Sequence, residues 1–177
     1  LGANVTTSST QTYTGAVTLS TDTTLTTTDS NVTFGSTIDG DGTARDLIIN
    51  TGGTTGTIQF VNTVGANDDL DAITITGNLN LDAAISNTTS LSVSGTSNLG
   101  ANVTTSSTQT YTGAVTLSGG TRTLTASTVN FGTTVAGGSN ALIITGALNL
   151  DGAATGLSTL SVSTTSNLGA NVTTSST

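Results

Sequence analysis

The stretch LGANVTTSSTQTYTGAVTLS occupies residues 1–20 and recurs without change at residues 99–118. Its first ten residues, LGANVTTSST, return once more at residues 168–177. Self-similarity of this kind is the sequence signature of solenoids and other repeat folds, in which each repeat packs on its neighbours. The three copies therefore predict a repeat architecture.

The spacing of the copies indicates the size of one repeating coil. Cutting the chain wherever a short apolar strand restarts gives units 1–22, 23–45, 46–72, 73–98, 99–120, 121–141 and 142–167. The second series has no counterpart of unit 46–72, and losing such a unit would destroy a globular core but not a solenoid. We therefore expect about seven full coils of about 21–27 residues. They form a four-coil block at 1–98 and a three-coil block at 99–167, and the next repeat starts at 168–177.

The residues within each unit predict strands. Apolar and polar residues alternate in three short segments per unit, for example residues 1–5, 13–15 and 17–19. Thr, Val and Ile favour strands, and the strong helix formers Lys and Glu are missing. Glycine-rich stretches such as DGDG at 39–42 and NTGGTTG at 50–56 suit corners. The pattern predicts an all-β parallel β-helix (β-solenoid) with three short strands per coil.

Composition and charge exclude several classes of partner. The chain of 177 residues has ten Asp against two Arg, a net charge of −8, and no Cys, His or Pro. It offers no basic patch for nucleic acid or anionic lipid. No apolar run approaches the ~20 residues that span a bilayer. We therefore expect no nucleic-acid binding and no membrane insertion.

Several segments resemble a known family. QTYTGAVTL at 11–19 and 109–117, VTFGSTI at 32–38 and GTIQFVNTVGANDDLDAITIT at 56–76 are similar to the tandem β-strand repeats of filamentous-haemagglutinin-like giant bacterial surface proteins. The resemblance covers essentially the whole chain. It implies a right-handed parallel β-helix, export to the cell surface, and a role in adhesion, biofilm or surface filaments.

Catalysis on such a solenoid would depend on paired carboxylates, because the chain has no His, Lys, Glu or Cys. The candidates for a general acid and base are Asp39 with Asp41, and Asp68 with Asp69 and Asp71. Both groups fall in corner-like loops rich in Gly and Asn. We therefore expect no enzyme, with no catalytic residue and no cofactor.

Calcium binding is a second use of the same loops, since hard cations prefer carboxylate and carbonyl oxygens. Asp39, Asp41 and Asp46 could supply part of such a site. The matching segment of the second block, VAGGSNA at 135–141, has no carboxylate. Solvated turn acids are the preferred interpretation, so we assign no metal ligands, and calcium at Asp39 and Asp41 stays open.

Threonine and asparagine patterns give two further alternatives. Threonine runs at residues 23–28 and 121–125 could match an ice lattice, but the motif does not recur in every coil, so solubilising threonines are preferred. Asn-x-Thr sequences mark glycan acceptors in eukaryotic secreted chains, and corner asparagines are the default interpretation for Asn4, Asn31, Asn87, Asn102 and Asn171. The aromatic residues are predicted to pack in the core or its corners: Tyr13, Tyr111, Phe34, Phe60 and Phe131.

The sequence thus favours a structural role. A rod with nearly identical repeats suits the shaft of a secreted extracellular filament, sheath or surface fibre, at the surface of a bacterium. Open coil ends would expose unpaired strands and predict self-association, and we expect it end to end or laterally into a fibre. The alternative is an adhesive surface module that binds glycans or other cells.

Overall fold

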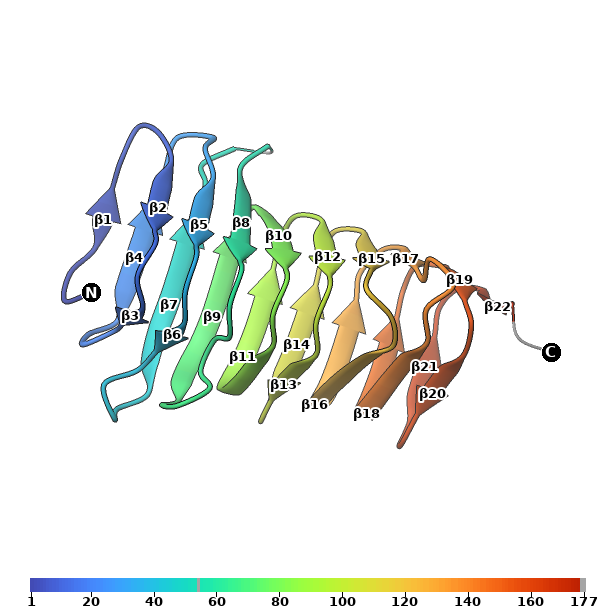
Figure 1. The fold of residues 1–177 in the computed structure, drawn as a ribbon. Coiled ribbons are helices and arrows are strands. Elements are labelled where there is room, and N and C mark those ends of the chain that lie inside the picture. The colour runs from blue at the N-terminus through green and yellow to red at the C-terminus, as the bar shows by residue number, and fades with distance from the viewer. Residues whose placement is uncertain (54, 176–177) are drawn as a thin grey trace.

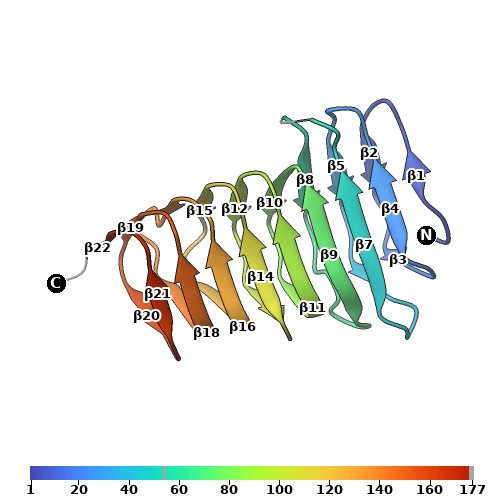
Figure 2. The ribbon, with the colours of Figure 1, turned by 180° about the vertical axis from the view of Figure 1, so that it is seen from behind.

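The computed structural model describes residues 1–53 and 55–175, and these residues form strands and turns without a helix. The strands stack as a parallel β-solenoid, in which strands of successive turns lie side by side along a rod (Figure 1). The view from behind shows the same regular stacking on the opposite side (Figure 2). The predicted fold class, an all-β parallel β-helix, is confirmed.

The chain visits three faces of the rod in a fixed order. The first face contains β1 (Val5–Thr6), β4 (Thr23–Thr26), β7 (Arg45–Asn50), β9 (Leu70–Thr76), β11 (Ile85–Val93), β14 (Thr108–Tyr111), β16 (Arg122–Phe131), β18 (Leu142–Leu150) and β21 (Ser166–Leu168). The second face contains β2 (Gln11–Tyr13), β5 (Val32–Phe34), β8 (Thr57–Phe60), β10 (Asn78–Leu81), β12 (Ser97–Leu99), β15 (Val115–Leu117), β17 (Val135–Ala136), β19 (Ala154–Leu157) and β22 (Val172–Thr174). The third face contains β3 (Val17–Thr18), β6 (Ile38–Asp39), β13 (Val103–Thr105) and β20 (Leu160–Val162), together with Val64 and the starts of β11, β16 and β18.

Strand registers give the length of each turn. On the second face, the stretch of chain from one register partner to the next is one turn, and there are eight such steps. The step with the most residues joins Val32 to Ile58, and one of the steps with the fewest joins Leu79 to Ser97. The number of turns differs from the expected number of about seven because residues 73–98, which were expected to form one coil, make more than one turn. They pass over the first, second and third faces and then over the first and second again. A turn with fewer residues still completes the circuit of the rod, because each of the three faces needs only a short strand. The ribbon is accordingly taller over β1–β9 than over the later coils (Figure 1).

Inward side chains fill the rod with a continuous apolar core. Leu, Ile and Val alternate inward on all three faces and are almost fully buried from Leu19 to Leu157. Aromatic rings stack from coil to coil, with centroids 4.9 Å apart for Tyr13 and Phe34 and 5.4 Å apart for Tyr111 and Phe131. Core packing of the aromatic residues is therefore confirmed.

A buried glutamine forms one corner in each of the two complete copies of the repeated phrase. The Gln109 amide nitrogen donates to the carbonyl oxygens of Val103 (3.1 Å) and Thr125 (2.9 Å), and its amide oxygen accepts from the Tyr111 hydroxyl (3.2 Å). Gln11 makes the same set of bonds in the first copy. A buried amide without such partners would cost free energy. The repeated phrase therefore folds into the same local corner in both copies.

Ser97 is an inward residue that does not suit the core. Its side chain is 2% exposed, and its hydroxyl has no hydrogen-bond partner among the described residues. We expect Ser97→Ala to raise the free energy of unfolding in urea by about 1 kcal/mol, because it removes an unsatisfied hydroxyl. Ser166 lies in the same TSNLG sequence but is exposed. Ser166→Ala should therefore change stability by less than about 0.5 kcal/mol, and equal effects at the two positions would contradict the explanation.

Candidate functional site

The acidic residues gather at one corner of the rod. Seven of the ten Asp lie where the chain passes from the third to the first face in its first three coils: Asp22, Asp39, Asp41, Asp46, Asp68, Asp69 and Asp71. This corner contains the carboxylates considered above for catalysis and for calcium.

Asp41 is paired with a cation in its own loop. The Arg45 guanidinium donates two hydrogen bonds to the Asp41 carboxylate, each 3.1 Å long. These bonds lower the pKa of Asp41 and raise the pKa of Arg45. A general acid needs a raised pKa to hold its proton near neutral pH, so this environment opposes that role for Asp41.

Asp39 is 9% exposed and fastens the next coil. Its carboxylate accepts hydrogen bonds from the Asn67 backbone N–H (2.9 Å) and from the Asn67 side-chain amide (3.0 Å). Burial raises the pKa of Asp39, but the hydrogen bonds outweigh burial and the pKa is lowered. Asp39 therefore serves as an ionised acceptor that ties two loops together, rather than as one of a pair with Asp41.

Protonation of Asp39 is expected to weaken the fold at low pH. Because its pKa is lowered in the folded state, its stabilising effect is present above about pH 4, the ordinary range of Asp, and is lost as the pH falls through the folded-state value. Thermal unfolding midpoints should therefore fall between pH 5 and pH 2, and the fall should be smaller in Asp39→Asn. Identical pH profiles for the two proteins would contradict this role.

The second acidic group is open to solvent. Asp68, Asp69 and Asp71 are all exposed. In the part of the chain that the structure describes, no three His, Cys, Asp or Glu side chains are placed to hold a metal ion together. The loop thus places its carboxylates along the corner without converging them on one point.

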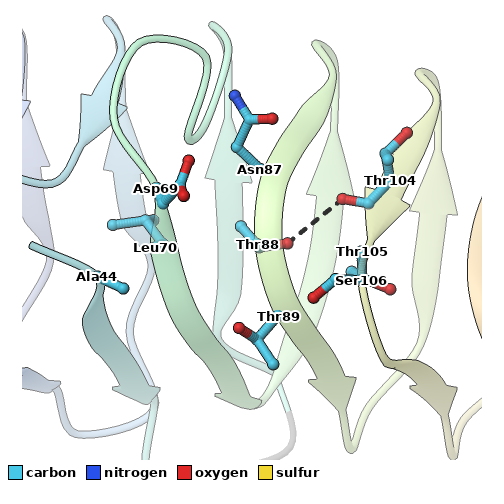
Figure 3. A pocket seen from close by; sticks show the side chains of 9 residues that line it. All are labelled: Ala44, Asp69, Leu70, Asn87, Thr88, Thr89, Thr104, Thr105 and Ser106. Atoms are coloured by element: carbon cyan, nitrogen blue, oxygen red, sulfur yellow. Dashed lines mark hydrogen bonds between the residues drawn. The ribbon is translucent and has the colours of Figure 1, made fainter.

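A shallow hollow of about 320 Å³ lies along the same corner, where the long loops give way to the shorter coils (Figure 3). It is at the small end of the range of ligand pockets. Its lining is rich in hydroxyl groups, with one amide and one carboxylate: Ala44, Asp69, Leu70, Asn87, Thr88, Thr89, Thr104, Thr105 and Ser106. Such a surface could form hydrogen bonds with a hydroxylated ligand.

Sequence reasoning singled out Asp69 and Asn87 but did not place them in one hollow. The lining comes from separate coils, and Asn87 takes a left-handed backbone conformation (φ 49°) at its rim. Nothing in the linear sequence places Asp69 and Ser106 along one hollow, because only the stacking register does so.

Corner asparagines act as acceptors between coils. The Asn4 carboxamide oxygen accepts the Thr24 N–H (2.8 Å), and Asn102 accepts the Thr123 N–H (3.0 Å). Asn31 does the same for the following coil. Three of the five Asn-x-Thr asparagines therefore connect neighbouring turns, as expected for corner positions.

Removing one of these acceptors should loosen two turns. We expect Asn102→Ala to lower the free energy of unfolding by about 1 kcal/mol, because the Thr123 N–H loses its partner. Asn102→Asp keeps an acceptor oxygen and is the matched control, with a smaller expected loss. Urea denaturation of both variants measures the difference, and equal losses would mean that this bond is not the cause.

Outward side chains form uncharged ladders along the rod. On the first face the ladder contains Thr24, Ile48, Thr74, Ser92, Thr110, Asn130, Asn149 and Asn167. The two threonine runs considered for ice binding do not share a face, since Thr24 lies on the first face and Thr123 on the third. The outward side chains of this face are thus mostly polar, with Ile48 as an exposed apolar member, and charge is confined mainly to the corners.

Comparison with known proteins gives no match. No protein-family model matches the chain, and no curated protein or solved structure matches it significantly. Among the described residues, no helix is long and apolar enough to cross a membrane.

Proposed function

We propose that this chain is a shaft segment of a secreted extracellular fibre, similar in role to the solenoid regions of filamentous-haemagglutinin-like bacterial surface proteins. The observation that supports the proposal most is the continuous apolar core, which runs from turn to turn and, among the residues that the structure describes between Leu47 and Leu157, buries no charged side chain. Backbone hydrogen bonds run along the rod axis and join each turn to the next. Such a rod resists extension along its whole length.

The test is whether added repeats add length. A chain carrying residues 1–167 twice should form a rod about 40 Å longer than the single copy, at ~4.8 Å per turn. Electron microscopy measures the length, and oriented fibres should show a meridional reflection near about 4.8 Å. Globular particles, or rods that thicken without lengthening, would exclude a shaft.

Glycan adhesion is a second candidate function, favoured by the hydroxyl-rich hollow beside Asp69. Binding on a glycan array should then be saturable and lost in Asp69→Ala. It should persist in Asp71→Ala, which removes an exposed carboxylate from the same loop. If the doubled chain forms a longer rod but the protein binds no glycan, the results would support the shaft function without adhesion.

The absence of catalysis stays part of the proposal. Turnover of polyuronides that disappears in Asp39→Asn or Asp69→Asn would contradict it. The proposed role also includes a location at the bacterial cell surface and self-association into a fibre. Light scattering at rising protein concentration tests the self-association.

A further inference from the structure

Identical copies of the repeated phrase lie on different faces of the rod. Val5 of the first copy pairs with Leu25 on the first face. The equivalent Val103 of the second copy pairs with Leu124 on the third face. Val172 of the third copy lies on the second face.

The registers give the reason. From Val5, four steps of pairing along the first face reach Val93, and the chain then crosses the second face before Val103 on the third. The block between the first two copies therefore makes four and two-thirds turns. From Val103, three steps reach Val162, and the first face precedes Val172 on the second. That block makes three and two-thirds turns, so the two blocks differ by one whole turn.

The shift applies to the rest of the block as well as to the phrase. Phe34 of VTFG lies on the second face, whereas Phe131 of VNFG lies on the first. The aromatic stack accordingly moves from the second face in the first block to the first face in the second. The glutamine corner is unchanged in both positions, because its bonds are made to its own and the next coil only.

We infer that each repeat block acts as a screw operation, which stops one face short of a whole number of turns and so presents the same motifs one face back round the rod, and three blocks return them to their starting face. Bulky aromatic stacks and wide loops are thereby shared among the three sides. If the aromatic stacks and wide loops of every block lay on one side, that side would be wider in every block, and the difference would accumulate as curvature of the rod. A long array of such blocks is therefore straight, and it offers the same outward side chains to a second copy approaching from any side.

The inference can be tested by cross-linking, whatever the function of the rod, because the chain has no native cysteine. Asn80 and Asn98 are register partners, with a side-chain hydrogen bond of 2.8 Å between them. Partner positions on adjacent strands lie about 4.8 Å apart, within the range that a disulfide spans. Asn80→Cys with Asn98→Cys should therefore form a disulfide on mild oxidation, as judged on non-reducing gels.

The competing arrangement places both copies on the same faces and makes residues 73–98 a single coil. It brings Asn80 next to Thr110 instead, because Thr12, the equivalent of Thr110, shares one second-face register with Thr33, Gln59 and Asn80. Asn80→Cys with Thr110→Cys should stay reduced, because Thr110 lies on the first face and Asn80 on the second, and its cross-linking would overturn the inference. Failure of both pairs would overturn it as well, provided that circular dichroism of the reduced variants matches the parent.

A second pair spans the boundary between the first and second blocks directly. Ser92 and Thr110 are outward partners on the first face. In the competing arrangement Thr110 lies on the second face, like its equivalent Thr12. Ser92→Cys with Thr110→Cys should cross-link as completely as the first pair, and its failure would contradict the screw arrangement.

Discussion

Replacing Tyr111 by alanine is expected to lower the free energy of unfolding by about 3–5 kcal/mol, the usual cost of removing a buried aromatic ring. The Tyr111 side chain is fully buried, and its ring stacks on Phe131. Its hydroxyl also donates to the buried Gln109 carboxamide, which would lose that partner. Urea denaturation followed by circular dichroism measures the loss.

The repeat supplies a matched control at Tyr13. The same sequence surrounds Tyr13 and Tyr111, and both hydroxyls donate to the preceding glutamine. Tyr13 lies in the first coil, is half-buried, and lines an open pocket at that end of the rod. Tyr13→Ala should therefore cost less than half as much as Tyr111→Ala. Equal losses would mean that local sequence, and not position along the rod, determines the contribution of the ring.

Deleting residues 50–75 should leave a folded rod that is one turn shorter. Asn50 and Thr76 are register partners on adjacent turns, so the deletion removes one whole step and joins Ile49 to Thr76. The new junction reads LIITGNLNLDAA, and the second block already contains LIITGALNLDGA at 142–153. We expect an unchanged β-sheet spectrum and an unfolding midpoint within a few degrees of the parent.

A much smaller deletion is the informative contrast. Removing residues 47–49 shortens a single strand, but it takes out Leu47 and Ile49, which are both fully buried. The loss of each should cost about 2–5 kcal/mol, because β7 becomes too short to fill its side of the core. If this short deletion proved milder than the loss of residues 50–75, the turn would not be the unit of stability.

Much of the fold could be predicted from local features of the chain. Alternation of Val, Leu and Ile with Thr and Asn fixes which side chains face inward, and glycine-rich loops mark corners. The inward orientation of Phe34 and Phe131 follows from the same alternation. These features depend on neighbours only a few positions apart, which explains why they are readable from sequence.

The candidate sites were less predictable. Asp39 and Asp41 are near in sequence, yet one is bonded to Asn67 in the next coil and the other to Arg45 in its own loop. The hollow beside Asp69 combines residues of separate coils. Contacts of this kind depend on which turn stacks on which, and a linear pattern does not specify that.

The sequence by itself determined a parallel β-solenoid and the inward orientation of its apolar residues. Only the tertiary structure decided the number of turns and the face on which each motif lies. The physical reason is that one corner sequence forms the same local bonds on any face, so LGANVTTSST does not encode its own orientation. The face is set by how much chain each preceding turn uses, from the short step between Leu79 and Ser97 to the long step between Val32 and Ile58, and that length is fixed only when the coils pair.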